Sequence, residues 1–130
     1  MCQLSDYRIV AVADPLPERC AEAAGKTGCA EYASIDELLE NSDARLVVVA
    51  TPSSTHFEDV SKVLQAGRHC IAEKPLALES AQADELVALA KEKGLGLFVN
   101  HSLLHGPDFH HFKRVIDSGI LGRLFSIRIC

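Results

Sequence analysis

The sequence predicts an α/β fold organised around a parallel β-sheet. Five short apolar segments of strand length alternate along the chain with segments of helical character, as in a series of β-α-β units. The segment 45–50 is almost continuously apolar, which is typical of a parallel strand that helices bury on both faces. Polar side chains follow the strands directly, and open parallel sheets bind ligands at the carboxyl ends of their strands.

The expected strands share short length, apolar character and flanking Gly, Pro, Asp or Ser residues. They lie at 8–13, 30–33, 45–50, 69–72 and 97–99. The segment at 30–33 is the weakest of them, and the segment at 97–99 is expected to be buried. A further segment at 124–129 alternates apolar and polar residues, which predicts a strand with one solvated face. This last strand therefore differs in kind from the others.

The expected helices are placed by their start and stop signals. They lie at 16–26, 35–40, 56–66, 80–93 and 107–116. Gly25 and Gly28 end the first, Ser34 caps the second, Gly67 ends the third, Ser80 caps the fourth and Pro107 opens the fifth. Apolar residues at helical spacing give the third and fourth helices a buried face, formed by Phe57, Val60, Val63 and Leu64 and by Ala83, Leu86, Val87 and Ala90.

The composition is that of one globular domain, and it argues against several functions. Of the 130 residues, 48% are hydrophobic and 24% are charged, unlike a disordered chain. A net charge of −5 without a run of Lys or Arg argues against a nucleic-acid partner. No apolar run approaches the roughly 20 residues that span a bilayer, and the first residues lack a signal pattern. We therefore expect a cytoplasmic protein without a membrane partner.

Cysteine and histidine residues give no metal signature. The five cysteines form no C-x-x-C pair and are expected to be reduced, mostly buried thiols. They are Cys2, Cys20, Cys29, Cys70 and Cys130. The spacing of His101, His105, His110 and His111 does not match a helical zinc site. We expect His110 and His111 on an exposed helix face, and His101, which follows a strand, is the better candidate for contact with a substrate.

Four polar clusters follow four of the expected strands. They are Asp14, the stretch 51–56, Glu73 with Lys74, and Asn100 with His101. Right-handed crossovers place the ends of successive parallel strands at one edge of the sheet. The sequence therefore predicts that these clusters line one ligand-binding edge.

Lys74 is the candidate for chemistry. It ends a buried strand beside Glu73 and precedes Pro75, so it is held in an extended conformation, and we hypothesise a cis bond to the proline. Partial desolvation disfavours the ammonium while Glu73 favours it, so proton affinity can be tuned for acid-base work. The alternative is a surface strand end with a solvated ion pair.

Asp14 and the loop after the 45–50 strand each admit two interpretations. The carboxylate of Asp14 is placed to accept hydrogen bonds from an adenosine ribose, favouring NAD over NADP, or it only starts a turn and caps the next helix. Thr51-Pro52 allows a ligand to approach the backbone, and His56 starts a helix whose positive end suits phosphate or ribose oxygens. The alternative there is a simple turn capped by Thr55.

Three stretches together resemble the Gfo/Idh/MocA oxidoreductase family. They are 48–56 with its T-P-x-x-x-H pattern, 72–75 with E-K-P, and 107–122. The resemblance covers nearly the whole chain and implies an incomplete, Rossmann-type doubly wound sheet at 1–121, which binds NAD(P). Residues 122–130 are then the first strand of a truncated α/β substrate domain.

The resemblance also implies roles for individual residues. Lys74 matches the catalytic lysine of the family, Glu73 a residue near the nicotinamide ribose, and Asp14 the acid on the adenosine ribose. The cofactor-lining positions are Ala50, Thr51, Pro52, His56 and Asn100. The implied activity is hydride transfer between nicotinamide and a hydroxyl-bearing carbon of a sugar, polyol or related small molecule. We expect the parent protein to be a homo-oligomer.

Departures from the family pattern lead to a second hypothesis. The chain has no G-x-G-x-x-G turn, it stops before the family's C-terminal histidine and aspartate, and 103–107 lacks an arginine found in relatives. We therefore expect a piece of a longer protein that binds NAD weakly or not at all by itself. The alternative is a non-catalytic remnant or regulatory nucleotide-binding module.

The missing first strand has a structural consequence. In the order 3-2-1-4-5-6 it lies between the strands at 8–13 and 45–50. Each buried, unsatisfied ladder group costs roughly 1–3 kcal/mol. We expect either a truncated piece of low stability or a sheet that pairs these two strands directly.

Overall fold

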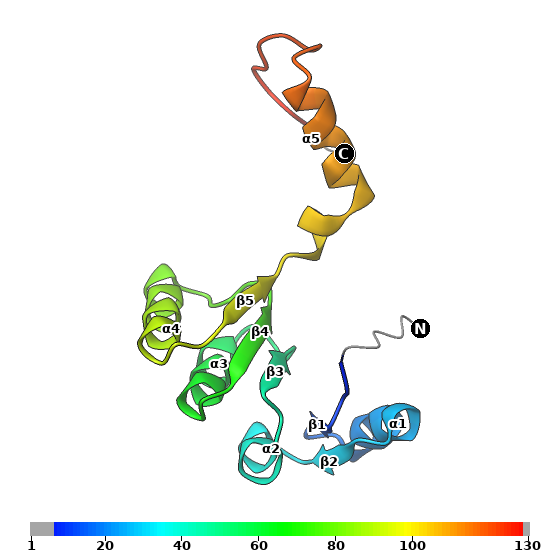
Figure 1. Ribbon diagram of the computed structural model, residues 1–130, viewed down its shortest axis with the longest axis vertical. Coiled ribbons are helices and arrows are strands. Elements are labelled where there is room, and N and C mark those ends of the chain that lie inside the picture. The colour runs from blue at the N-terminus through cyan, green and yellow to red at the C-terminus, as the bar shows by residue number, and fades with distance from the viewer. Residues whose placement is uncertain (1–6, 129–130) are drawn as a thin grey trace. The chain divides into compact units, whose positions relative to one another are not determined.

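The computed structural model describes residues 7–128 and divides the chain into two compact units, 1–99 and 100–130 (Figure 1). Each unit is described by itself. The domain boundary that we expect after residue 121 stays a prediction. Cys2, Cys130 and the end of the 124–129 segment lie outside the described residues.

Helices and strands alternate throughout the first unit, as predicted for an α/β fold. The strands are β1 (Ala11–Ala13), β2 (Ala30–Tyr32), β3 (Leu46–Val49), β4 (His69–Glu73) and β5 (Leu97–Asn100). The helices are α1 (Pro17–Thr27), α2 (Ile35–Asn41), α3 (His56–Gln65) and α4 (Ser80–Glu92). Within the described part of the chain, no helix is both long and apolar enough to cross a membrane.

The strands form two sheets. In one, β1 pairs in parallel with β2; in the other the order is β3-β4-β5, with β3 and β4 parallel and Val47 opposite Cys70. Cys70 N–H donates to the Gly96 carbonyl at 2.9 Å, which joins β4 to the start of β5. Among the described residues no ladder joins β1 to β3. The alternative of direct pairing between these two strands is therefore wrong.

Helices α3 and α4 bury one face of the three-stranded sheet (Figure 1). The core of this layer consists of Val47, Val49, Val60, Val63, Leu64, Cys70, Ala72, Leu86 and Ala90. Side chains on a strand point alternately to opposite faces, so Val48 and Phe98 lie on the other face and are each 61% exposed. The expectations that 45–50 is buried on both faces and that 97–99 is a buried strand are therefore wrong. Val87 is also exposed, and half-buried Leu89 packs against the core in its place.

Most helix ends follow the sequence signals. Gly28 ends α1 in the left-handed conformation at φ 72°, which glycine adopts without steric cost, and its N–H donates to the Ala24 carbonyl. Ser34 caps α2, because its hydroxyl accepts from the Glu37 N–H at 3.2 Å. Ser80 is the first residue of α4, not its cap, and Glu79 occupies the cap position.

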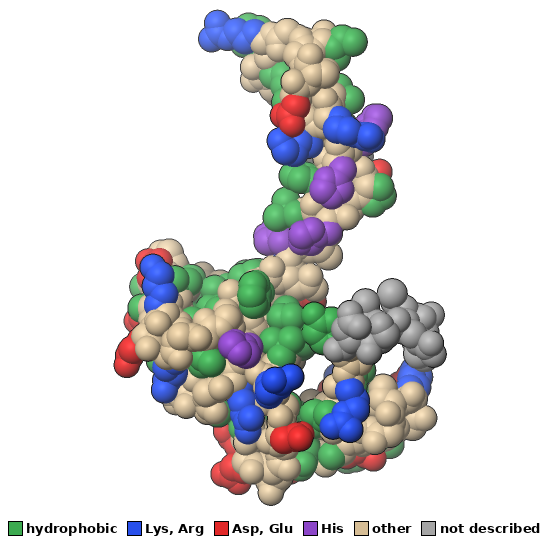
Figure 2. Space-filling model, viewed as in Figure 1, with side chains coloured by type: hydrophobic (Ala, Val, Ile, Leu, Met, Phe, Trp, Pro, Cys, Tyr) green, Lys and Arg blue, Asp and Glu red, His purple; other side chains and the backbone are tan. Residues whose placement is uncertain are grey.

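The second unit contains a 3₁₀ helix, η1 (Ser102–His105), and the predicted helix α5 (Pro107–Asp117). No described residue of this unit is buried, and its hydrophobic and histidine side chains lie on the surface (Figure 2). Residues 124–128 form no strand. The strand predicted at 124–129 is therefore not formed in its described part, because a strand needs a partner for its ladder groups.

Candidate functional site

Two loops at the carboxyl ends of neighbouring strands meet at one edge of the three-stranded sheet. The loop of residues 50–55 follows β3, and Lys74 and Pro75 follow β4; because β3 and β4 are adjacent and parallel, both loops leave at the same edge. His56 joins them. Its Nδ1 lies 2.6 Å from the Pro75 carbonyl oxygen and its Nε2 lies 2.8 Å from the Thr51 carbonyl oxygen. The predicted convergence of these two clusters is observed.

The 51–56 loop is a turn held by its own hydroxyl groups. Thr55 N–H donates to the Pro52 carbonyl at 2.9 Å, and the Thr55 hydroxyl lies 3.1 Å from that of Thr51. The Thr51 hydroxyl donates to the carboxylate of Asp59 at 2.7 Å. Thr55 occupies the N-cap position of α3 without a side-chain capping bond, so capping by its hydroxyl is wrong, although the turn is present. Thr51 and Pro52 are exposed and can meet a ligand.

Glu73 is the last residue of β4, Lys74 follows it, and the residue before them is buried. Ala72, the residue before them, is fully buried, Glu73 is half-buried and Lys74 is exposed. The Lys74–Pro75 peptide bond is cis, as hypothesised. An exposed ammonium can donate hydrogen bonds to a ligand. Among the described residues Lys74 is in contact with solvent, so the partial desolvation expected from the sequence is not observed in this structure.

Asp14 follows β1, in the other sheet. One carboxylate oxygen accepts from the Leu16 N–H at 2.9 Å, and the other lies 3.5 Å from Nη1 of Arg19. The carboxylate therefore forms a turn before α1, as one interpretation of the sequence expected, but it does not cap the helix, because Leu16 occupies the N-cap position without a side-chain capping bond. Arg19 was missed in the sequence analysis. Its position five residues after Asp14, in the first turn of an expected helix, was the available signal.

Asn100 and His101 lie at the end of β5 and directly before η1. Both are exposed, and both begin the second unit. Of the four polar clusters, the structure thus brings together the 51–56 stretch and the Glu73-Lys74 pair. The roles expected for Asn100 and His101 stay predictions.

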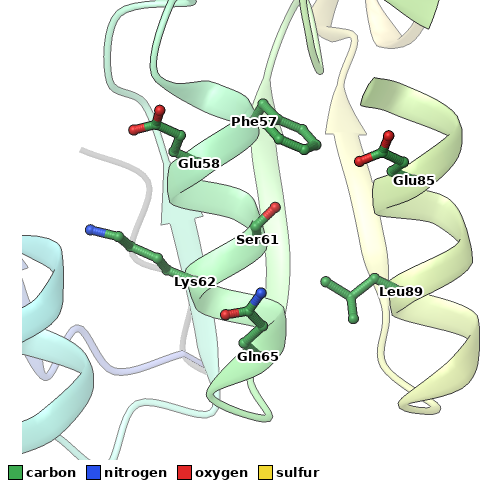
Figure 3. Close-up of a pocket in the computed structure, with 7 residues that line it drawn as sticks. All are labelled: Phe57, Glu58, Ser61, Lys62, Gln65, Glu85 and Leu89. Carbon is green, nitrogen blue, oxygen red and sulfur yellow. The ribbon is translucent and has the colours of Figure 1, made fainter. Parts of the chain in front are cut away.

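A shallow groove of about 480 Å³ lies between α3 and α4. In Figure 3, Phe57 and Ser61 of α3 face Glu85 and Leu89 of α4 across this groove, which contains none of the predicted site residues. The exposed Thr51, Pro52 and Lys74 place the candidate site at an open edge of the sheet. No group of three potential metal ligands occurs among the described side chains, and His110 and His111 are exposed on α5.

A model of the oxidoreductase family with an NAD-binding Rossmann fold matches residues 1–101. The chain is 40% identical over 107 residues to the UDP-N-acetylglucosamine 3-dehydrogenase of Acidithiobacillus ferrooxidans, covering 82% of this chain and 34% of that protein. It is 33% identical over 124 residues to a dTDP-3,4-didehydro-2,6-dideoxy-alpha-D-glucose 3-reductase of Saccharopolyspora spinosa, covering 95% of this chain and 37% of that protein.

Solved structures show the same fold. The WlbA dehydrogenase of Bordetella pertussis, in complex with NADH and UDP-GlcNAcA, superposes with a TM-score of 0.84 at 31% identity, covering 95% of this chain and 36% of that one. A 3-ketoreductase of Actinomadura kijaniata in complex with NADP gives 0.83 at 33% identity, covering 89% and 37%. The chain spans about a third of the length of these relatives. It belongs to the Gfo/Idh/MocA oxidoreductase family, whose members carry an NAD-binding Rossmann fold.

Proposed function

We propose that this chain is the cofactor-binding, lysine-bearing part of an NAD(P)-dependent oxidoreductase. The complete enzyme would transfer hydride between nicotinamide C4 and a hydroxyl-bearing carbon of a sugar, polyol or related small molecule. One observation carries the proposal: His56 holds the exposed Thr51-Pro52 loop against the residue that follows Lys74. Two exposed binding elements are thereby fixed side by side at the ligand-binding edge of a parallel sheet.

The chain's own residues have distinct tasks in this proposal. Lys74 donates a hydrogen bond to the oxygen of the reacting carbon and passes a proton to or from it, while Glu73 contacts the nicotinamide ribose. The backbone at Ala50, Thr51 and Pro52 borders the cofactor, together with Asn100. His56, matched to a cofactor-lining position, is buried and supports this loop through its two backbone hydrogen bonds. Asp14 accepts from the adenosine ribose, and His101 contacts the substrate. The bound dinucleotide supplies the hydride chemistry.

For the cofactor we propose NAD, with NADP less favoured. Asp14 follows β1, which corresponds to the second strand of a complete Rossmann fold. A carboxylate at that position binds ribose hydroxyls and repels a 2′-phosphate. Arg19 lies beside Asp14 and reduces the preference for NAD over NADP, because a guanidinium binds phosphate well. Relatives are solved with NADH and with NADP, so both cofactors are compatible with the family.

The relatives narrow the substrate class. The two sequence relatives are named for enzymes of nucleotide-linked sugars, one attached to UDP and one to dTDP. We infer a nucleotide sugar whose ring hydroxyl or ketone is the reacting group. Cytoplasmic location and a homo-oligomeric parent remain part of the proposal. The competing hypothesis is a non-catalytic or regulatory nucleotide-binding module of the same fold.

Replacing the lysine tests the activity. In the complete enzyme, Lys74→Met should lower kcat about 100- to 10,000-fold, the range for a lost acid-base group, with the Kd for NADH nearly unchanged. Lys91→Met, an exposed lysine in the last turn of α4, is the matched control. Stopped-flow absorbance of NADH with a UDP-sugar measures both. Full turnover by the Lys74 variant would refute the assignment.

Cofactor binding by the 130-residue chain separates the two hypotheses further. We expect little change when NADH fluorescence is titrated with this chain alone, because no glycine turn is available to hold the pyrophosphate. Micromolar affinity would contradict this expectation. Such binding combined with no turnover in the complete protein would favour the regulatory module.

A further inference from the structure

The side chains of Thr51, Thr55 and Asp59 form a chain of hydrogen bonds beside the proposed cofactor loop. The Thr55 hydroxyl lies 3.1 Å from the Thr51 hydroxyl, which in turn lies 2.7 Å from a carboxylate oxygen of Asp59. Thr51 is exposed, whereas Thr55 and Asp59 are half-buried at the start of α3. The function proposed above involves the backbone of Thr51 and gives its side chain and Asp59 no role.

The carboxylate determines where the hydroxyl hydrogens point. An ionised carboxylate only accepts hydrogen bonds, whereas a hydroxyl has one hydrogen and two lone pairs. The hydrogen of Thr51 is therefore directed at Asp59. Since Thr51 has no second hydrogen, Thr55 is the donor between the two hydroxyls, and it shares its hydrogen with the Pro52 carbonyl oxygen at 3.0 Å. One lone pair on Oγ1 of the exposed Thr51 is left for a ligand.

We propose that Asp59 is a positioning residue that makes the Thr51 side chain a hydrogen-bond acceptor for a ribose hydroxyl of the cofactor. This inference rests on the proposed function and narrows it, because a loop at the start of a helix can hold either phosphate or ribose oxygens. Phosphate oxygens are acceptors, and Thr51 has no hydrogen to give them. A ribose hydroxyl can donate to the remaining lone pair.

The charge of Asp59 acts in the same direction. A carboxylate beside the loop repels an anion such as phosphate. Hydrogen bonds in a chain polarise one another, so donation to the carboxylate makes Oγ1 of Thr51 a stronger acceptor. Lys62, on the next turn of α3, forms its ion pair with Asp36 at 2.7 Å, which leaves the Asp59 carboxylate to the Thr51 hydroxyl.

The position of Thr51 selects the ribose on the nicotinamide side. Thr51 follows β3, and the adjacent parallel strand β4 ends in Glu73, for which we propose contact with the nicotinamide ribose. Lys74, proposed to act at the reacting carbon, comes next in the chain. Asp14, proposed to bind the adenosine ribose, follows β1 in the other sheet.

A purely structural role for Asp59 is the competing explanation. A carboxylate in the first turn of a helix is stabilised by the helix dipole. Glu58 lies in the same turn, is exposed and lines the groove between α3 and α4 (Figure 3). A dipole effect applies to both residues, whereas the ribose contact requires Asp59. Glu58 is therefore the matched control.

Cofactor analogues separate the two roles. In the complete enzyme, fluorescence titration gives the Kd of NADH and of NADH analogues that lack the 2′- or the 3′-hydroxyl of the nicotinamide ribose. Thr51→Val should raise the Kd of NADH about 3- to 10-fold, as expected for one lost hydrogen bond. It should leave the Kd of one analogue unchanged, because that analogue lacks the donor. Thr51→Ser keeps the hydroxyl and should bind NADH as the wild type does.

The carboxylate variants test the positioning role. Asp59→Leu should raise the Kd of NADH about 2- to 10-fold, with the same dependence on the ribose hydroxyl. Asp59→Asn keeps an acceptor oxygen and should restore the wild-type Kd, while Glu58→Leu should leave it unchanged. If Asp59 acts through Thr51, the double variant Thr51→Val/Asp59→Leu should bind NADH no more weakly than Thr51→Val alone.

The outcomes distinguish this inference from the proposed function. An unchanged Kd of NADH in Thr51→Val, or an equal rise for NADH and both analogues, would overturn the ribose contact, and this exposed variant decides even if Asp59→Leu does not fold. Additive losses in the double variant would overturn the positioning role. Full turnover by Lys74→Met would refute the proposed catalysis and leave the ribose contact standing. A wild-type enzyme that binds no NADH would overturn both.

Discussion

The first unit contains two halves that differ in packing. In the half with β3, β4 and β5, Val60, Val63, Leu64 and Cys70 are all fully buried. In the half with β1 and β2, the strands are three residues long and β1 is only half-buried. The core beneath the end of β4 is therefore formed mainly by the half that contains β3, β4 and β5. Asp14 belongs to the β1–β2 half, which is less tightly packed.

This difference separates the two ends of the proposed cofactor site. Groups held by packed strands keep their geometry more precisely than groups on loosely packed elements. The end that would hold nicotinamide is fixed by α3, α4 and the hydrogen bonds of His56 to the Thr51 and Pro75 carbonyl oxygens. The end that would hold the adenosine ribose depends on the start of α1. We expect the two ends to respond independently to mutation.

Truncating a core leucine should produce the largest effect. Leu64 is fully buried, with 0% of its surface exposed to solvent. The substitution Leu64→Ala therefore removes buried methyl groups and leaves a cavity. We expect a loss of about 2–5 kcal/mol in the free energy of unfolding. Leu16→Ala, in the β1–β2 half at 41% exposure, should cost less than about 1 kcal/mol. Urea titration followed by circular dichroism compares them, and similar losses would contradict the contrast.

A buried thiol makes the β3–β4–β5 half sensitive to high pH. Burial raises the pKa of Cys70 to about 11, so the native state keeps a proton that the unfolded chain releases near pH 9. This contribution to stability is complete below about pH 9 and is lost as the pH rises towards 11. The free energy of unfolding should then fall by up to about 1.4 kcal/mol per pH unit.

Matched variants isolate this effect from other groups that titrate at high pH. The free energy of unfolding of Cys70→Ala should fall less between pH 9 and 11 than that of the wild type. Cys29→Ala, in the β1–β2 half, should show the same fall as the wild type. Unfolding in urea at pH 8, 9, 10 and 11 provides the measurement. A decline of equal size in wild type and Cys70→Ala would show that the thiol does not cause it.

The sequence predicted the order of elements better than their burial. Strand and helix positions follow from local patterns, such as the Ser34 cap and Gly28 stop, which act within a few residues. Exposure of Val48 and Phe98 could not be predicted, because it depends on which face distant helices cover. The two hydrogen bonds of the buried His56 ring could not be predicted either, because one of the partners, Pro75, lies 19 residues away in the sequence.

The smallest expected effect concerns Asp14. Asp14→Ala removes the acceptor for the Leu16 N–H before α1, and loss of such a hydrogen bond costs about 0.5–1.5 kcal/mol in the free energy of unfolding. Asp14→Asn keeps an acceptor oxygen and loses only the ion pair with Arg19, whose side chain is 67% exposed. We expect its free energy of unfolding to fall by less than about 1 kcal/mol. Amide hydrogen exchange should show faster exchange in α1 for the alanine variant and unchanged protection of β4. Loss of protection in β4 would mean that the two halves unfold as one unit, and the independence of the two cofactor ends would then be wrong.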